Sequence, residues 1–231
     1  MPNVHAFALL APRCVVCGIA RGDALCAGCL DDYLPAALAR CPRCAARWPG
    51  SSGATACGAC LVDPPHFDAA IALGDYAPPL DAMVLALKTR AQLHLAQAFG
   101  VELANRRRGR VRWRAVVPLP LAFEQQRARG FNQAVELARP LARALGIPLA
   151  ADVLLRTRAT APQHLLARDD RRHNVRGAFA TATASRERID GADLLLVDDV
   201  MTSGATLDAA SEALKAGGAV RVTAAVVART P

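Results

Sequence analysis

The distribution of cysteine constrains this chain more than any other feature of its sequence. All eight cysteines of the 231 residues lie before residue 61, in four Cys-x-x-Cys pairs. Two such pairs supply the four thiolates of one tetrahedral metal site, with metal–sulfur distances of about 2.3 Å. The sequence therefore predicts two four-cysteine sites, whose candidate ligands are Cys14, Cys17, Cys26, Cys29, Cys41, Cys44, Cys57 and Cys60.

We expect Zn2+ in both sites, in a structural role, because four cysteine ligands leave no open position for a substrate. Iron fits the same sulfur ligands. Sequential pairing of the knuckles is the simplest arrangement, but a crossed arrangement of the first pair with the third also fits the spacing. Gly18, Gly28 and Gly58 stand where tight turns of the knuckles favour a residue without a Cβ.

Four disulfides are a competing interpretation, which the expected cellular location disfavours. Residues 1–12 contain a short apolar run, but neither the basic segment nor the cleavage site that is typical of a signal peptide. No stretch approaches the ~18 apolar residues that a membrane helix needs. We therefore expect a cytoplasmic protein without membrane insertion, in a compartment where disulfides are rare.

After the cysteines, short apolar segments alternate with helical patterns. The predicted strands are residues 67–73, 115–118, 194–197 and 220–227, and the predicted helices are residues 80–89, 93–103, 132–145 and 206–216. We expect Pro140 to kink or break the third of these helices. The alternation is typical of an α/β fold, a parallel sheet with helices on both faces.

The step Asp63-Pro64-Pro65 is stiff and polar, and it predicts a domain boundary. On this interpretation residues 1–64 form the metal-binding module and residues 65–231 form the α/β domain. Ligands of parallel sheets bind outside the carboxyl ends of the strands. The functional residues of the second domain are expected there.

The most distinctive chemistry follows the strand predicted at residues 194–197. Asp198 and Asp199 come directly after it, followed by a small polar turn and a helix. N–H groups at a helix start bind phosphate, and carboxylates accept hydrogen bonds from sugar hydroxyls or help to hold hydrated Mg2+. A ribose 5-phosphate offers both a phosphate for the N–H groups and hydroxyls for the carboxylates. The plainer interpretation is a capped helix, but adjacent buried carboxylates are costly without a role.

Three segments resemble one known family. Residues 197–206 resemble the loop of type I phosphoribosyltransferases that binds phosphoribosyl pyrophosphate (PRPP). Residues 127–133, Arg-Ala-Arg-Gly-Phe-Asn-Gln, are similar to a ComF family signature. A second ComF signature is resembled by five elements of this sequence: Gln163, Leu166, Arg171, Asn174 and the tripeptide 177–179. The four-knuckle N-terminus resembles the double zinc ribbon that precedes this domain in many members.

The resemblance to the ComF family implies a type I phosphoribosyltransferase-like sheet and roles for individual residues. Asp198 and Asp199 become candidate catalytic residues. Arg127 and Arg129 become candidates for binding the diphosphate, unless their segment only caps the following helix. Mg2+ is expected to accompany PRPP. The remaining candidates for binding the substrate are Val200, Met201, Thr202, Ser203, Gly204, Ala205 and Thr206.

Two further segments have a structural and a functional interpretation. Residues 156–176 are rich in arginine and resemble the flap that closes over PRPP in related enzymes, although a solvated basic loop explains them as well. Lys88 lies at the end of a predicted helix, where a cation interacts favourably with the helix dipole. We expect this structural role for Lys88 in preference to a role in the active site.

Two functions remain open from the sequence. The first is transfer of a phosphoribosyl group from PRPP to an unknown acceptor, in a protein that the resemblance to the ComF family links to DNA uptake. The second is a non-catalytic adaptor of the DNA-uptake machinery that senses PRPP or binds single-stranded DNA. The net charge of +8 and the basic run at residues 106–114, with Trp113 for base stacking, support contact with nucleic acid or polyphosphate. A solvated basic surface explains the charge equally well.

Overall fold

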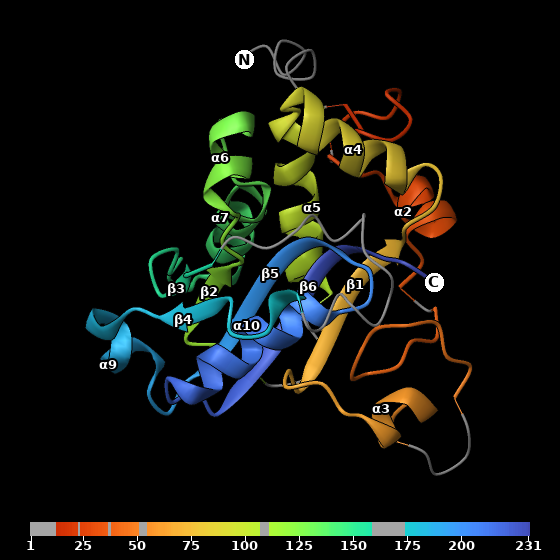
Figure 1. Ribbon diagram of the computed structural model, residues 1–231. Helices are drawn as coiled ribbons and strands as arrows, with labels where there is room; N and C mark the ends of the chain where they lie inside the picture. Colours follow the sequence, from red (N-terminus) through yellow and green to blue (C-terminus); the bar gives the residue numbers. More distant parts are fainter. Residues whose placement is uncertain (1–12, 23, 37, 51–54, 107–110, 159–173) are drawn as a thin grey trace.

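A computed structural model describes residues 13–22, 24–36, 38–50, 55–106, 111–158 and 174–231. Its centre is a sheet of four parallel strands in the order β1-β6-β5-β2 (Figure 1). The strands are β1 (Ala69–Asp75), β2 (Ala115–Pro118), β5 (Asp193–Met201) and β6 (Arg221–Arg229). The parallel sheet predicted from the sequence is confirmed.

Helices cover both faces of this sheet (Figure 1). Leu195 and Val197 of β5 pack with helices on one face, whereas Leu194 and Leu196 pack on the other. Burial on both faces explains why the strands are almost continuously apolar. The first face carries α4 (Leu80–Arg90), α5 (Leu93–Asn105) and α7 (Gln133–Leu145), and the second carries α10 (Ala205–Ala216).

Smaller elements surround this core. Two short strands pair antiparallel beside it. No helix within the described residues is long and apolar enough to span a membrane. The smaller elements are α2 (Ala27–Tyr33), α3 (Gly58–Val62), α6 (Phe123–Arg129), β3 (Leu154–Arg156), β4 (Phe179–Thr181), the 3-10 helix η2 (Thr183–Ser185) and α9 (Arg186–Ile189).

Strand β5 and two of the knuckle glycines differ from the sequence predictions, whereas a third glycine agrees with them. Strand β5 continues beyond Val197 to Met201, because its last residues still pair with β6. Gly18 has a φ of 69° and does form a left-handed turn. Gly28 lies in the first turn of α2 and Gly58 is the first residue of α3, so their assignment to tight turns was wrong.

Helix α7 continues through Pro140, so the predicted break is absent. The proline packs against α5 at Gly100. A Cβ at Gly100 would lie 2.5 Å from Pro140 Cγ and 2.6 Å from the Leu137 carbonyl oxygen. Only a glycine lets the two helix backbones approach this closely.

We therefore expect Gly100→Ala to lower the free energy of unfolding by about 1–3 kcal/mol, because the added methyl group overpacks the contact between α5 and α7. The matched control is Gly28→Ala, where an added Cβ meets nothing within 4 Å. Chemical denaturation measures both. Equal stability of the two variants would contradict the close packing described here.

Candidate functional site

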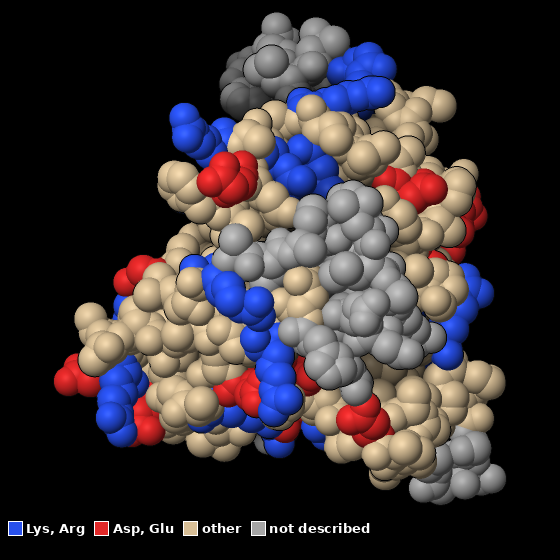
Figure 2. Space-filling model, viewed as in Figure 1, with Lys and Arg blue, Asp and Glu red and all other residues tan. Residues whose placement is uncertain are grey.

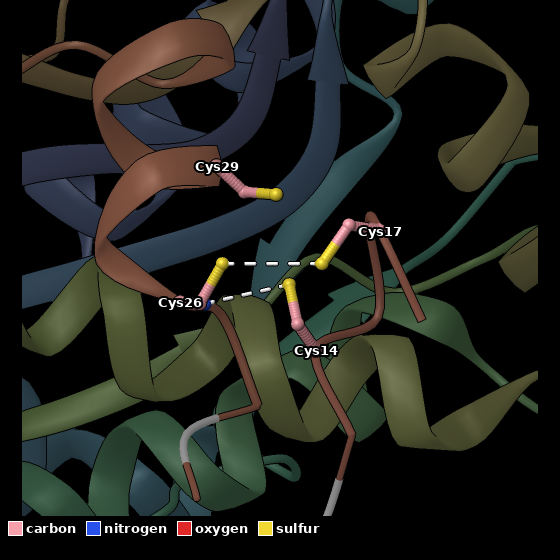
Figure 3. Close-up of side chains that lie close together, drawn as sticks. All are labelled: Cys14, Cys17, Cys26 and Cys29. Atoms are coloured by element: carbon pink, nitrogen blue, oxygen red, sulfur yellow. Dashed lines mark hydrogen bonds between the residues drawn. The ribbon is translucent and has the colours of Figure 1, made fainter. Parts of the chain in front are cut away.

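The eight cysteines form two clusters within the described residues. In each, one sulfur from every cysteine lies within 4.8 Å of the other three. Cys14, Cys17, Cys26 and Cys29 form the first cluster (Figure 3), which joins the start of α2 to the preceding knuckle. The sequential pairing is thus confirmed and the crossed arrangement is wrong. The second cluster consists of Cys41, Cys44, Cys57 and Cys60.

The geometry of both clusters fits Zn2+. Zinc–sulfur bonds of about 2.3 Å in a tetrahedron separate neighbouring sulfurs by about 3.8 Å. The Sγ atoms of Cys17 and Cys26 lie 4.0 Å apart, and those of Cys44 and Cys57 lie 3.7 Å apart. These distances are close to the tetrahedral spacing, so the two clusters are zinc-binding sites with four cysteine ligands each.

Backbone N–H groups also prepare the sulfurs for a metal. The N–H of Cys26 donates to Cys14 Sγ at 3.4 Å, and the N–H of Cys57 donates to Cys41 Sγ at 3.3 Å. Burial raises the pKa of Cys14, but N–H donors, led by that of Cys26, outweigh it and lower this pKa to about 6. The thiolate is therefore populated at neutral pH, as metal binding requires.

We expect the purified protein to contain two equivalents of zinc. Cys29→Ser and Cys60→Ser should each remove one, because each variant loses a buried ligand of a different site. Elemental analysis of the folded protein measures the metal content. Loss of both equivalents from either variant, or a content of one in the parent chain, would contradict two separate sites.

The second region of interest lies at the carboxyl end of β5. Asp199 is only 3% exposed, and Lys88 Nζ from α4 lies 2.8 Å from its Oδ2 atom. Asp198 Oδ1 accepts a hydrogen bond from the N–H of Asp199 at 2.9 Å. The sequence predicted only an interaction of Lys88 with the helix dipole. The ion pair with Asp199 was not predicted, because it forms only when α4 lies beside β5 in the folded protein.

The two carboxylates affect each other. Burial first, and then the charge of Asp199, raise the pKa of Asp198 to about 8, although Lys88 and the N–H of Asp199 act in the opposite direction. The charge of Arg156, on β3, also interacts with the charge of Asp198. Burial lowers the pKa of Arg156 and the charge of Asp198 raises it, and its guanidinium lies 5.5 Å from the ring centroid of Phe179. Two cations from distant segments thus border the carboxylates.

The turn after β5 leads directly into α10. Gly204 precedes the helix with a φ of 84°, which a residue with a Cβ adopts only under strain. Ser203 Oγ accepts a hydrogen bond from the N–H of Ala205 at 3.3 Å. The first N–H groups of a helix lack helical partners and favour an anion. The turn therefore presents backbone N–H groups of the kind that can bind an anion.

The candidate substrate residues divide into two groups. The side chains of Val200, Met201 and Ala205 pack into the core, so these residues can offer a ligand only backbone groups. Thr202 is exposed, and Ser203 and Thr206 are half-buried. Their three hydroxyl groups are placed on the turn and on the first turn of α10.

Comparison with known proteins agrees with both parts of this description. A family model named "Phosphoribosyl transferase domain" matches residues 132–231, and one named "Double zinc ribbon domain" matches residues 6–61. "DNA utilization protein YhgH" of Escherichia coli (strain K12) is 33% identical over 196 residues, which cover 82% of this chain and 84% of that protein. "Competence protein F" of Haemophilus influenzae is 31% identical over 215 residues, covering 88% and 90%. This chain belongs to the ComF family.

Among solved structures, the glutamine PRPP amidotransferase of B. subtilis, complexed with ADP and GMP, aligns with a TM-score of 0.39 and 21% identity. The alignment covers 57% of this chain, which spans only 25% of that enzyme. This similarity is too low to support an argument about function.

The ComF signature at residues 127–133 lies on α6 and the start of α7. Arg127 is exposed on α6. Arg129 donates to Gln133 Oε1 at 2.6 Å. Asn132 caps α7 by accepting from the N–H of Ala134 at 2.9 Å, and it donates to the Leu119 carbonyl oxygen at 3.0 Å. These contacts show that the signature shapes the chain after β2, and binding of a diphosphate by its arginines stays a prediction.

The described residues omit 159–173 and with them three residues of the second ComF signature, Gln163, Leu166 and Arg171. The flap predicted at residues 156–176 is therefore described only at its two ends. Arg158 lies at the first end and donates to the carbonyl oxygens of Asn174 and Arg176, at 3.1 and 2.9 Å, at the other.

The raised pKa of Asp198 has a consequence for stability. Because this pKa is about 8 in the folded protein, well above the ordinary value of 3.8, the carboxyl group contributes stability below about pH 4. That contribution is lost as the pH rises through 8. We expect Asp198→Asn to raise the free energy of unfolding at pH 9 by about 2 kcal/mol and to change it little at pH 4.

Asp152→Asn is the control. The hydrogen bond from Arg188 lowers the pKa of Asp152, so the charged form of Asp152 stabilises the fold and its substitution should lower the free energy of unfolding at pH 9. Denaturation without Mg2+ or PRPP measures the difference. A destabilised Asp198→Asn protein at pH 9 would show that this carboxylate is well stabilised in the folded chain.

Proposed function

We propose that this protein binds PRPP with Mg2+ and transfers its phosphoribosyl group to an acceptor. The observation that carries the proposal is the junction of β5 and α10, where two adjacent carboxylates precede a turn suited to phosphate. Membership in the ComF family and the match to a phosphoribosyltransferase domain model support it. The acceptor is left open.

In this proposal the 5-phosphate binds to N–H groups of the turn and of the first turn of α10, where the helix dipole favours an anion. Thr202, Ser203 and Thr206 add hydroxyl donors. Asp198 and Asp199 accept hydrogen bonds from the ribose hydroxyls. Such donors stabilise the charged carboxylates, whose burial is otherwise costly.

The diphosphate of PRPP requires positive charge. Lys88 and Arg156 border the carboxylates, and Arg127 and Arg129 are further candidates on α6. On the face seen in Figure 2, Lys and Arg side chains form a band in front of β4 and α10. Carboxylate and phosphate oxygens are the ligands that Mg2+ prefers, and the bound ion would neutralise the leaving diphosphate.

The proposed reaction is a displacement at C1 of the ribose. A nitrogen of the acceptor forms the new bond to C1, the C1–oxygen bond breaks, and its electron pair leaves with the diphosphate. The acceptor nitrogen then loses its extra proton to solvent. Positive charge develops on the ribose in the transition state, where the carboxylates of Asp198 and Asp199 stabilise it. Positioning and charge stabilisation, without a covalent intermediate, are the contributions of the protein.

The alternative is a non-catalytic adaptor that senses PRPP or binds single-stranded DNA together with DNA-uptake proteins. The names of the relatives, which refer to DNA utilization and competence, favour a link to DNA. The basic run at residues 106–114 does not support it as predicted. Trp113 is 7% exposed and donates to Thr223 Oγ1, and Arg106 contacts Glu102 and the Leu34 carbonyl oxygen. Residues 107–110 lie outside the described part of the chain.

Titration with Mg-PRPP by calorimetry, followed by assays of pyrophosphate release, tests the proposal. We expect the parent protein to bind and Asp198→Asn/Asp199→Asn to lose binding. Lys88→Ala should weaken affinity at least tenfold, because it removes the cation at Asp199. The control is Lys215→Ala, since Lys215 is the second lysine of the chain and pairs with Asp68 at 2.9 Å.

A panel of bases, amines and single-stranded DNA should identify the acceptor. Pyrophosphate release that depends on one acceptor and on both aspartates establishes the transferase. Binding of PRPP without turnover on any acceptor favours the adaptor. If the parent protein does not bind PRPP at millimolar concentration, the transferase and the PRPP-sensing adaptor are both wrong, and the DNA-binding adaptor is the remaining alternative.

A further inference from the structure

The two zinc ribbons attach to different parts of the α/β core. The first contacts the helical face: Leu34 packs with α4 and α5, and its carbonyl oxygen accepts a hydrogen bond from Arg106. The second contacts the sheet edge, where the Pro42 carbonyl oxygen accepts from the N–H of Ala70 at 3.0 Å. Ala45, 1% exposed, packs into the core on the α10 side of the sheet. By these contacts, the second ribbon lies on the α10 side of the sheet and the first ribbon lies on the opposite, helical face.

One arginine joins this second ribbon to the turn after β5. Arg229 ends β6 and pairs in register with Met201. Its Nε donates to the carbonyl oxygen of Cys44, a zinc ligand, at 3.3 Å. Its Nη1 donates to the carbonyl oxygens of Met201, at 3.1 Å, and of Thr202. A single guanidinium therefore contacts a zinc knuckle and the candidate phosphate-binding turn.

These contacts fix the direction of the turn's peptide groups. In a trans peptide the carbonyl and the next N–H point in opposite directions. Because the carbonyl groups of Met201 and Thr202 face Arg229, the N–H groups of Thr202 and Ser203 point away from it. The guanidinium thus helps to orient two potential phosphate donors from the other side of the backbone, together with the N–H of Thr230, which also donates to the Met201 carbonyl oxygen at 3.0 Å.

A cavity on the ribbon side of the turn leaves few packing contacts between the turn and α3, so the hydrogen bonds of Arg229 matter for the position of the turn. A cavity of about 460 Å3 lies between the second ribbon and the start of α10, lined by Cys60 and Val62 of α3 and by Ser203 and Gly204. The turn is therefore not packed tightly against α3. Arg229, beside Cys44, links the turn to the ribbon by hydrogen bonds.

We propose that Arg229 is a positioning residue through which the second zinc site holds the PRPP-binding turn in its binding conformation. This inference rests on the proposed function. Binding of zinc at the second site and binding of PRPP then favour each other, since a coupling between two sites is reciprocal. The first zinc site, attached to the helical face, does not share this coupling.

The first test compares Arg229→Gln with Arg221→Gln, an exposed arginine at the other end of the same strand. Calorimetry should show that Arg229→Gln weakens Mg-PRPP binding at least tenfold, whereas Arg221→Gln binds like the parent. Amide hydrogen exchange of residues 200–206 should accelerate only in Arg229→Gln. Arg229→Lys keeps the charge but not the planar fork, so it should restore only part of the affinity.

The second test uses zinc release to a chromophoric chelator. We expect Mg-PRPP to slow the release of one of the two zinc ions in the parent protein. Arg229→Gln should retain two zinc ions and lose this protection. Cys60→Ser should weaken PRPP binding and speed exchange in residues 200–206, while Cys29→Ser, the matched loss at the first site, should do neither.

The outcomes separate this inference from the proposed function. If the parent binds PRPP and Arg229→Gln binds equally well with unchanged exchange, the inference is wrong and the proposed function stands. If the parent does not bind PRPP, the proposed function is wrong and the linkage to PRPP falls with it. If Cys60→Ser does not fold, Arg229→Gln with its two zinc ions still decides.

Discussion

The placement of two adjacent carboxylates at the end of β5, Asp198 half-buried and Asp199 buried, is the constraint on which the rest of this structure depends. A buried charge needs partners, and the partners come from segments far apart in the chain. Lys88 comes from α4 and pairs with Asp199, while Arg156 comes from β3 and acts on Asp198. The pKa of Asp198 nevertheless stays raised. The ligand-free fold thus favours the neutral form of the Asp198 carboxyl group, and strongly shifted pKa values of this kind are frequent at functional sites.

The parallel sheet is the means by which these groups meet. β5 and β2 run side by side and end at the same edge, so the turn before α10 and the chain after Pro118 share one region. Asn132 reinforces this edge by linking the start of α7 to Leu119. The ComF signature therefore has a structural contribution that is visible without any ligand.

The zinc ribbons are integrated with this core. Metal binding supplies folding free energy to modules too small for a core of their own, but here both ribbons also pack on the α/β part. Leu25 and Leu34 join the helical cluster, and Ala45 joins the cluster on the α10 side. The boundary proposed at residues 64–65 accordingly separates two parts of the chain that share buried surface. Arg229 adds hydrogen bonds between the second ribbon and the turn of the candidate site.

Local patterns predicted much of this molecule. Cysteine spacing predicted both metal sites, and apolar periodicity placed α4, α5, α7 and α10 within about two residues. The signals that failed depend on tertiary contacts. Lys88 looks like a helix-end charge until α4 lies beside β5, and Trp113 looks available for stacking until Thr223 accepts its N–H. Arg229 carries no local signal, because its partners are up to 185 residues away in sequence.

A crystal structure of the protein with Mg2+ and PRPP would show whether PRPP binds at the junction of β5 and α10. We expect the 5-phosphate at the first turn of α10, the ribose hydroxyls within hydrogen-bond distance of Asp198 and Asp199, and Arg229 still bridging Cys44 and the turn. PRPP bound elsewhere, for example in the cavity between α3 and the turn, would contradict it. So would its absence from this site at saturating concentration.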